Sequence, residues 1–204
     1  MIGHWALGIR HFAPVSGGSR QRVGLVLLKP ARRDGTVPVM ATGEDALKRD
    51  YPDLRDDQIL AIGVYGETVA AYRYTVLSEK VPDPADRRTF AAIADEEQSH
   101  KQRLQALLDK YHPDSAFYLS DQDKALVVAG PRLINVRDVD DYRQVLDLAL
   151  DTEYRVASFY EVMSKRVQNP ALRSVFEELA REGFCHHQRL SELTRKHAPP
   201  PAGP

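Results

Sequence analysis

The 204-residue sequence is 43% apolar and 28% charged, a composition that supports a packed globular domain and excludes global disorder. Its 28 basic and 29 acidic residues give a formal net charge of −1, which argues against a nucleic-acid-binding protein that relies on bulk positive charge. A single cysteine excludes an internal disulfide framework and any four-cysteine zinc or iron site, and no apolar run of about 18 residues predicts a membrane span, so we expect a cytoplasmic protein.

The two ends of the chain differ in composition from the part between them. Residues 1–39 carry six basic residues and one acidic residue, and we expect a loose basic N-terminal extension there rather than a nucleic-acid tether. This segment lacks the continuous apolar stretch of a secretory signal. Residues 198–204 are rich in proline and glycine, which predicts a disordered tail. The folded domain is therefore expected within residues 40–197.

Four long stretches of that domain have helical periodicity. We predict helices over about 54–80, from after Pro84 to about 111, over about 139–167, and from Asn169-Pro170 to about 196. The links within the first and the second pair are short, so each pair should form an antiparallel hairpin. The connection of residues 112–137 is long enough to cross the bundle. Two hairpins joined by a crossover are typical of an all-α, ferritin-like four-helix bundle.

The sequence also contains an internal repeat. When it is shifted by 86 residues, positions 67–113 match positions 153–199 at 19 of 47 residues without a gap. Unrelated sequences would agree at only a few of these positions, so the two hairpins are predicted to be copies related by an approximate two-fold axis.

The repeat keeps acidic residues inside apolar helical faces. Glu67 and Glu153 lie in the middle of the apolar stripes of the first and third helices. Glu97 and His100 are three residues apart and share one face of the second helix, and His186 occupies the matching place on the fourth. Buried acids without a partner cost several kcal/mol, and three of them repel, which predicts a cation among them. These five residues match the ligand set of di-iron and di-manganese carboxylate bundles, apart from one missing glutamate.

Other interpretations of these residues remain open. A metal-free bundle with charged His100 and His186 would hold the same acids in a proton-sharing network. With metal, either one ion or two would fit. Tyr74 and Tyr160 lie two turns from their glutamates on the same face, and we expect core tyrosines whose hydroxyls bond to a carboxylate or carbonyl, including the metal ligands of the opposite helix.

These patterns resemble those of rubrerythrin-type members of the ferritin-like superfamily. The resemblance covers residues 54–111 and 138–197. It rests on Glu67 with Ala71 and Tyr74, Glu96-Glu97-x-x-His100, Glu153 with Ala157 and Tyr160, and Glu182 with His186. It implies an iron centre, or a manganese one, that reduces peroxide or oxygen with electrons from a donor that the sequence does not identify. We also expect a homo-oligomer, most simply a dimer, with no nucleic-acid or membrane partner.

The sequence departs from this family at three points. Gly183 stands where the second Glu-x-x-His should have its glutamate, and the adjacent Glu182 lies about 100° around the helix. Val156 stands where rubrerythrins often carry a further ligand, and the usual C-terminal rubredoxin module is absent. Five of six expected ligands remain, and the missing side chain at Gly183 is expected to leave an open coordination position. We expect Cys185, on the next face, to be buried for structural reasons.

Three functional hypotheses follow. The first is an oxidoreductase that acts on peroxide or oxygen. The second is an iron-handling or storage-related binding protein without turnover, and the third is a metal-free helical module for dimerisation. Metal content separates the third hypothesis from the others, and peroxide turnover separates the first from the second.

Overall fold

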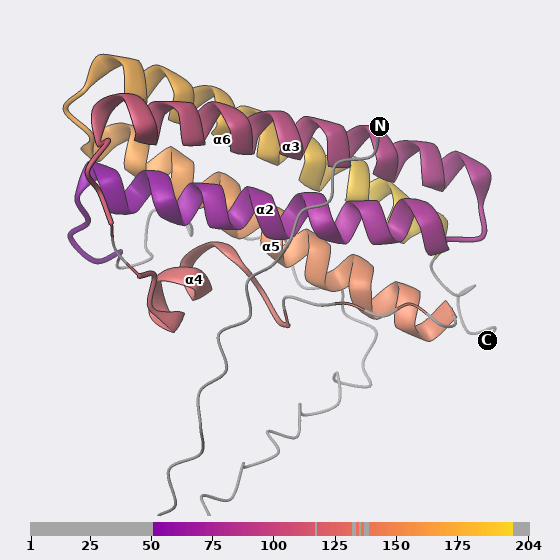
Figure 1. Cartoon of the computed structure of the whole chain (residues 1–204). Coiled ribbons are helices and arrows are strands. Elements are labelled where there is room, and N and C mark those ends of the chain that lie inside the picture. Colours follow the sequence, from indigo (N-terminus) through magenta and orange to yellow (C-terminus); the bar gives the residue numbers. More distant parts are fainter. Residues whose placement is uncertain (1–50, 117, 132–133, 135, 137–138, 198–204) are drawn as a thin grey trace, which may run out of the picture. The chain divides into compact units, whose positions relative to one another are not determined.

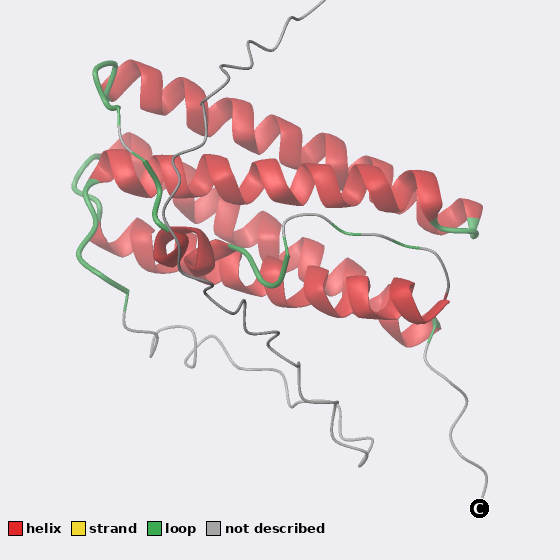
Figure 2. Cartoon of the chain, turned by 60° about the horizontal axis from the view of Figure 1, so that its bottom comes forward, coloured by secondary structure: helices red, strands yellow, loops and turns green. Residues whose placement is uncertain are grey.

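The structure is a computed structural model that describes residues 51–116, 118–131, 134, 136 and 139–197. The expected N-terminal extension and the proline-rich tail lie outside these residues. The described part is helical and contains no strand (Figure 2). Among its helices, none combines the length and apolarity that a membrane crossing requires.

Two helical hairpins joined by a crossover make up this part of the chain (Figure 1). Its helices are α2 (Asp56–Lys80), α3 (Pro84–Tyr111), α4 (Asp121–Val127), α5 (Val139–Arg166) and α6 (Pro170–Lys196). Helix α2 pairs with α3 and α5 with α6, and the hairpins meet through contacts of α2 with α5 and of α3 with α6. The prediction of an all-α, ferritin-like bundle is confirmed, and the long helices begin and end within two residues of their expected bounds.

The second helix of each hairpin begins with the same local device. The Asp83 side chain accepts hydrogen bonds from the first backbone amides of α3, and the Asn169 side chain does so at the start of α6. Proline follows both capping residues, where its missing N–H costs nothing. These caps explain why the sequence located the helix starts so closely.

The crossover between the hairpins contains helix α4, which the sequence analysis did not predict. Ser120 caps it in a reciprocal arrangement with Asp123. Helix α4 contacts both α2 and α5. Its buried Val127 faces Gly66 so closely that a Cβ on that glycine would lie 3.3 Å from the valine side chain. The apolar stretch of the crossover thus covers the side of α2 that would otherwise face water.

A buried arginine forms hydrogen bonds with the end of this crossover. The guanidinium of Arg73 donates to Thr152 Oγ1 at 2.7 Å and to the carbonyls of Ala129 and Pro131 at 2.6 and 2.7 Å. Arg73 is 1% exposed, and the repeat places Phe159 at the matching position of the second hairpin. The arginine therefore joins α2, α5 and the crossover. Phe159, at the matching position of the second hairpin, cannot form these hydrogen bonds.

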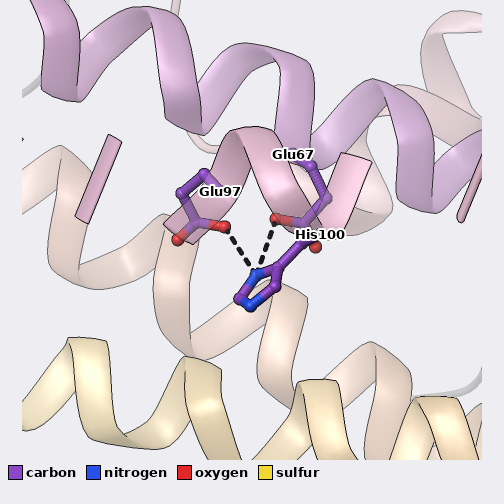
Figure 3. A group of neighbouring side chains, drawn as sticks. All are labelled: Glu67, Glu97 and His100. Atoms are coloured by element: carbon purple, nitrogen blue, oxygen red, sulfur yellow. Dashed lines mark hydrogen bonds and ion pairs between the residues drawn. The ribbon is translucent and has the colours of Figure 1, made fainter. Parts of the chain in front are cut away.

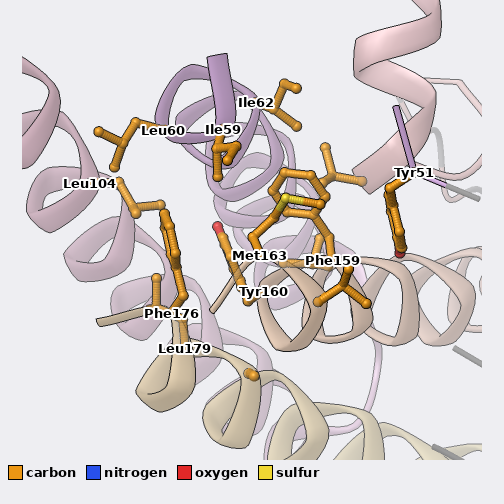
Figure 4. Close-up of a cluster of buried hydrophobic side chains, with 14 of the residues drawn as sticks. Tyr51, Ile59, Leu60, Ile62, Leu104, Phe159, Tyr160, Met163, Phe176 and Leu179 are labelled. Carbon is orange, nitrogen blue, oxygen red and sulfur yellow. The ribbon is translucent and has the colours of Figure 1, made fainter. Parts of the chain in front are cut away.

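Two apolar clusters occupy the two ends of the bundle interior. Figure 4 shows the first, in which Leu60, Leu104, Tyr160 and Phe176 pack together. The second includes residues from later in α2 and from the beginning of α5, with Phe90 among those contributed by the other helices. Along α2 the two clusters meet near Glu67. The polar residues between them therefore lie in a medium of low polarity, where unpaired charge is costly.

Candidate metal centre

Five acidic and imidazole side chains converge between these apolar clusters. Glu67 comes from α2, Glu97 and His100 from α3, Glu153 from α5 and His186 from α6. All five are buried. The structure thus brings together every residue that the sequence analysis proposed as a metal ligand.

The first half of the cluster consists of Glu67, Glu97 and His100 (Figure 3). One potential ligand atom from each lies within 4.8 Å of the others. His100 Nδ1 is 3.2 Å from Glu97 Oε2 and 3.8 Å from Glu67 Oε2. The ring nitrogen and the two carboxylates therefore face one small volume, as the donors of a single cation would.

The second half consists of Glu97, Glu153 and His186, again within 4.8 Å of one another. His186 Nδ1 lies 2.7 Å from Glu97 Oε1 and 3.6 Å from Glu153 Oε2. Glu97 therefore belongs to both halves, with Oε2 near His100 and Oε1 near His186. A carboxylate placed in this way can bridge two cations.

Two tyrosines hold the other two carboxylates of the cluster, Glu67 and Glu153. The Tyr160 hydroxyl donates to Glu67 Oε1 at 2.5 Å, and the Tyr74 hydroxyl donates to Glu153 Oε1. Each bond runs between α2 and α5, from one hairpin to the other. Burial and the nearby carboxylates raise the pKa of both hydroxyls well above the usual value, so they remain donors.

Two glutamates outside the predicted ligand set contact the outer nitrogens of the histidines. Glu96 Oε2 is 2.6 Å from His186 Nε2, and Glu182 Oε2 is 2.8 Å from His100 Nε2. The sequence analysis counted both glutamates among the residues that resemble the family but included neither among the expected ligands. Their recurrence in both copies was the available signal, because a carboxylate behind a ligating imidazole fixes its orientation.

The two histidines lie against the buried carboxylates and counter their negative charge. Burial and the neighbouring Glu97 carboxylate raise the pKa of Glu67 to about 8. Burial disfavours charge on His100 and His186, but attraction from the surrounding carboxylates outweighs it and raises their pKa values to about 10 and about 11. Within the described residues, Glu67, Glu97 and Glu153 form ion pairs with histidines and with no lysine or arginine.

One buried atom shows that the residues also fit a metal ion. His186 Nδ1 makes no hydrogen bond, although carboxylate oxygens of Glu97 and Glu153 lie nearby, because neither contact has hydrogen-bond geometry. A divalent cation that displaces the proton from Nδ1 would meet an imidazole lone pair and carboxylate oxygens in a dry core, which suits metal binding. Carboxylates with imidazole are ligands that iron and manganese accept.

Neither departure from the ligand pattern is compensated by another residue. A Cβ at Gly183 would lie 3.0 Å from the Cβ of Ala157, so close packing of α5 on α6 fills the space that was expected to be an open coordination position. Val156 is buried within the first apolar cluster. The prediction for Cys185 was wrong, since this residue is exposed on the outer side of α6.

Comparisons with known proteins agree with this geometry. The family model described as Rubrerythrin matches residues 58–139 and 144–202. Among solved structures, a hypothetical protein from Pyrococcus furiosus is similar in fold, with 20% identity, a TM-score of 0.61, and coverage of 69% of this chain and 89% of that one. No curated protein matches the sequence. The family match extends over both hairpins and the buried cluster between them, and on this basis the chain belongs to the rubrerythrin family.

Proposed function

We propose that this protein binds iron, or manganese in its place, between its two hairpins and acts as an oxidoreductase on peroxide or oxygen. The observation that carries the proposal is the pair of buried three-residue clusters that share Glu97. One half would be held by Glu67, Glu97 and His100, and the other by Glu97, Glu153 and His186. Bound iron would supply the redox chemistry.

The chain itself supplies orientation and a water-poor surrounding. Tyr160 and Tyr74 fix one oxygen of Glu67 and Glu153, so the second oxygen of each carboxylate is left for a cation. The apolar clusters on either side limit the access of bulk water to the buried donors. With Gly183 in place of a glutamate, the chain offers one fewer carboxylate than the family pattern, so the centre would carry less negative charge.

Metal content tests the first part of the proposal. The protein reconstituted with Fe(II) under anaerobic conditions should bind roughly one to two ions per chain, as the ligand set implies. The variants Glu97→Ala and His100→Ala should each lose at least about half of this iron. Elemental analysis after desalting measures the content, and a wild-type stoichiometry near zero would exclude both metal-dependent functions.

Peroxide turnover tests the second part. Reduction of one hydrogen peroxide to two waters consumes two electrons and two protons, so iron-loaded protein with an added electron donor should consume peroxide repeatedly. Absorption spectra recorded during the reaction would follow the oxidation and re-reduction of the centre.

A second candidate function is iron handling without turnover. It is favoured by the single cysteine, because this sequence holds no four-cysteine iron site that could deliver electrons to the cluster. In this case iron would be oxidised once by peroxide and not be reduced again by donors. Multiple turnovers with a chemical or protein donor would exclude it.

A further inference from the structure

The outer contacts of the two histidines differ, although the histidines occupy the same position of the repeat. Arg189 Nη1 lies 3.0 and 3.2 Å from the two carboxylate oxygens of Glu96, on the neighbouring helix. The repeat predicts the same contact between Arg103 and Glu182. Arg103 instead pairs with Glu178.

The sequence of α6 explains this exchange of partners. Glu178 lies one turn before Glu182, within reach of Arg103, whereas the matching position on α3 is Ala92. Arg189 therefore has no competing acid at the place where Arg103 finds one. Within the described residues, Glu182 is left without an arginine ion pair, while Glu96 keeps one.

The two imidazoles also differ, and His186 is the more buried and has the better-defined outer hydrogen bond. His186 forms a 2.6 Å hydrogen bond with Glu96 through Nε2, and its side chain is 1% exposed. His100 Nε2 is 2.8 Å from Glu182, but without hydrogen-bond geometry, and its side chain is 11% exposed. On the inner side, His100 Nδ1 is hydrogen-bonded to Glu97, whereas His186 Nδ1 has no hydrogen bond.

These differences determine how ready each ring is to bind a cation. A carboxylate that accepts from Nε2–H fixes the tautomer in which the lone pair of Nδ1 is available, and it fixes the ring plane. For His186 this lone pair faces Glu97 and Glu153, and the carboxylate behind it is itself held by Arg189. For His100 the ring is more exposed and the carboxylate behind it lacks that support.

We propose that Glu96, held by Arg189, is a positioning residue that makes the half formed by His186, Glu97 and Glu153 the tighter of two unequal cation sites. The proposal rests on the proposed function, because it assumes that the cluster binds divalent cations. It adds an order of filling: the His186 half binds first, and the half with Glu67 and His100 binds second.

A Mn(II) titration of the full chain, followed by the electron paramagnetic resonance signal of unbound Mn(II), tests this order. His186→Gln should remove the tighter phase of binding, and His100→Gln should leave it in place. Glu96→Ala should weaken the tighter phase by about 10- to 100-fold. Glu182→Ala, the variant at the matching position of the repeat, should leave that phase within about threefold of wild type.

Further variants separate positioning from a general effect on the fold. Glu96→Gln keeps an oxygen that accepts from Nε2–H, so it should recover most of the affinity that Glu96→Ala loses. Arg189→Met should weaken the tighter phase by a smaller factor than Glu96→Ala, and Arg103→Met should not weaken it. The metal-free Glu96 and Glu182 variants should each unfold cooperatively at a thermal midpoint near that of the wild type, since both side chains are about two-fifths exposed.

The outcomes distinguish this inference from the proposed function. Equal losses in Glu96→Ala and Glu182→Ala, or loss of the tighter phase in His100→Gln, would overturn the order of filling while leaving metal binding intact. Absence of Mn(II) and Fe(II) binding in the wild-type chain would instead remove the proposed function, and the inference with it.

Discussion

Helices α2 and α3 supply three of the five buried candidate metal ligands, whereas α5 and α6 supply two. The difference arises at one position of the repeat, where the first hairpin has Glu97 and the second has Gly183. The donor lost from the second hairpin is not replaced, and Glu97 serves both halves instead. The two copies therefore differ at this ligand position, and one carboxylate contacts both histidines.

The contacts that hold the donors show why the cluster tolerates this loss. The hydroxyls of Tyr74 and Tyr160 and the outer carboxylates each contact a donor that belongs to the other hairpin. None of these contacts requires a side chain at position 183. Packing of one copy on the other therefore helps to position the candidate ligands, and the group of Glu97, Glu153 and His186 takes residues from both hairpins.

The largest expected effect on metal content comes from the carboxylate that both halves of the cluster share, Glu97. Glu97→Ala should remove most of the bound cation, because both halves lose a ligand at once. Glu67→Ala and Glu153→Ala each affect one half, so each should lose about half of the content of a fully loaded chain. Metal analysis of the three variants measures this, and equal losses in all three would contradict the shared role of Glu97.

The next effect concerns Arg73, the residue that distinguishes the first hairpin structurally. Arg73→Leu would leave the Ala129 and Pro131 carbonyls without their donor, at a cost of about 3 kcal/mol, or roughly 6–12 °C in the thermal midpoint. Lys165→Leu is the control, since its pair with Glu161 on the same helix is partly exposed and worth about 0.5 kcal/mol. Thermal unfolding of the two variants would decide, and a similar small loss in both would show that the crossover does not depend on Arg73.

These examples also show which features a sequence can specify. The helix bounds and the five converging donors were accessible because capping residues, helical spacing and the repeat are local or periodic signals. The contacts of Arg73 were not, because an arginine in an apolar stretch does not reveal which carbonyls of a distant crossover it will meet. The pairing of Arg103 with Glu178 likewise depends on how α3 and α6 face each other, and the exposure of Cys185 depends on which side of α6 is covered.

A smaller effect is expected from restoring the lost carboxylate. Gly183→Glu returns the family pattern in sequence, but its Cβ would lie 3.0 Å from that of Ala157, so α5 and α6 must separate slightly. We expect a loss of about 1–3 kcal/mol, as for other overpacked core positions. Adding Ala157→Gly should reduce this loss despite the cost of a glycine within a helix. Urea unfolding of the single and double variants measures the coupling, and additive losses would show that Ala157 does not limit the space.

The smallest effect concerns the caps that start α3 and α6, where the two hairpins carry Asp83 and Asn169. The Lys196 ammonium, together with two backbone amides, lowers the pKa of Asp83 from 3.8 to about 2. A carboxyl whose pKa is lower in the folded state contributes stability above its unfolded pKa, and this contribution is lost as the pH falls from about 4 towards 2. Asp83→Asn keeps an oxygen that can cap the helix, as Asn169 does, but removes the titration. The thermal midpoint of the variant should therefore fall less steeply between pH 4 and pH 2 than that of the wild type. If the thermal midpoints of the two proteins fell in parallel with pH, the negative charge of Asp83 would add no stability to the cap. A neutral asparagine, as at Asn169 in the second hairpin, would then serve equally well.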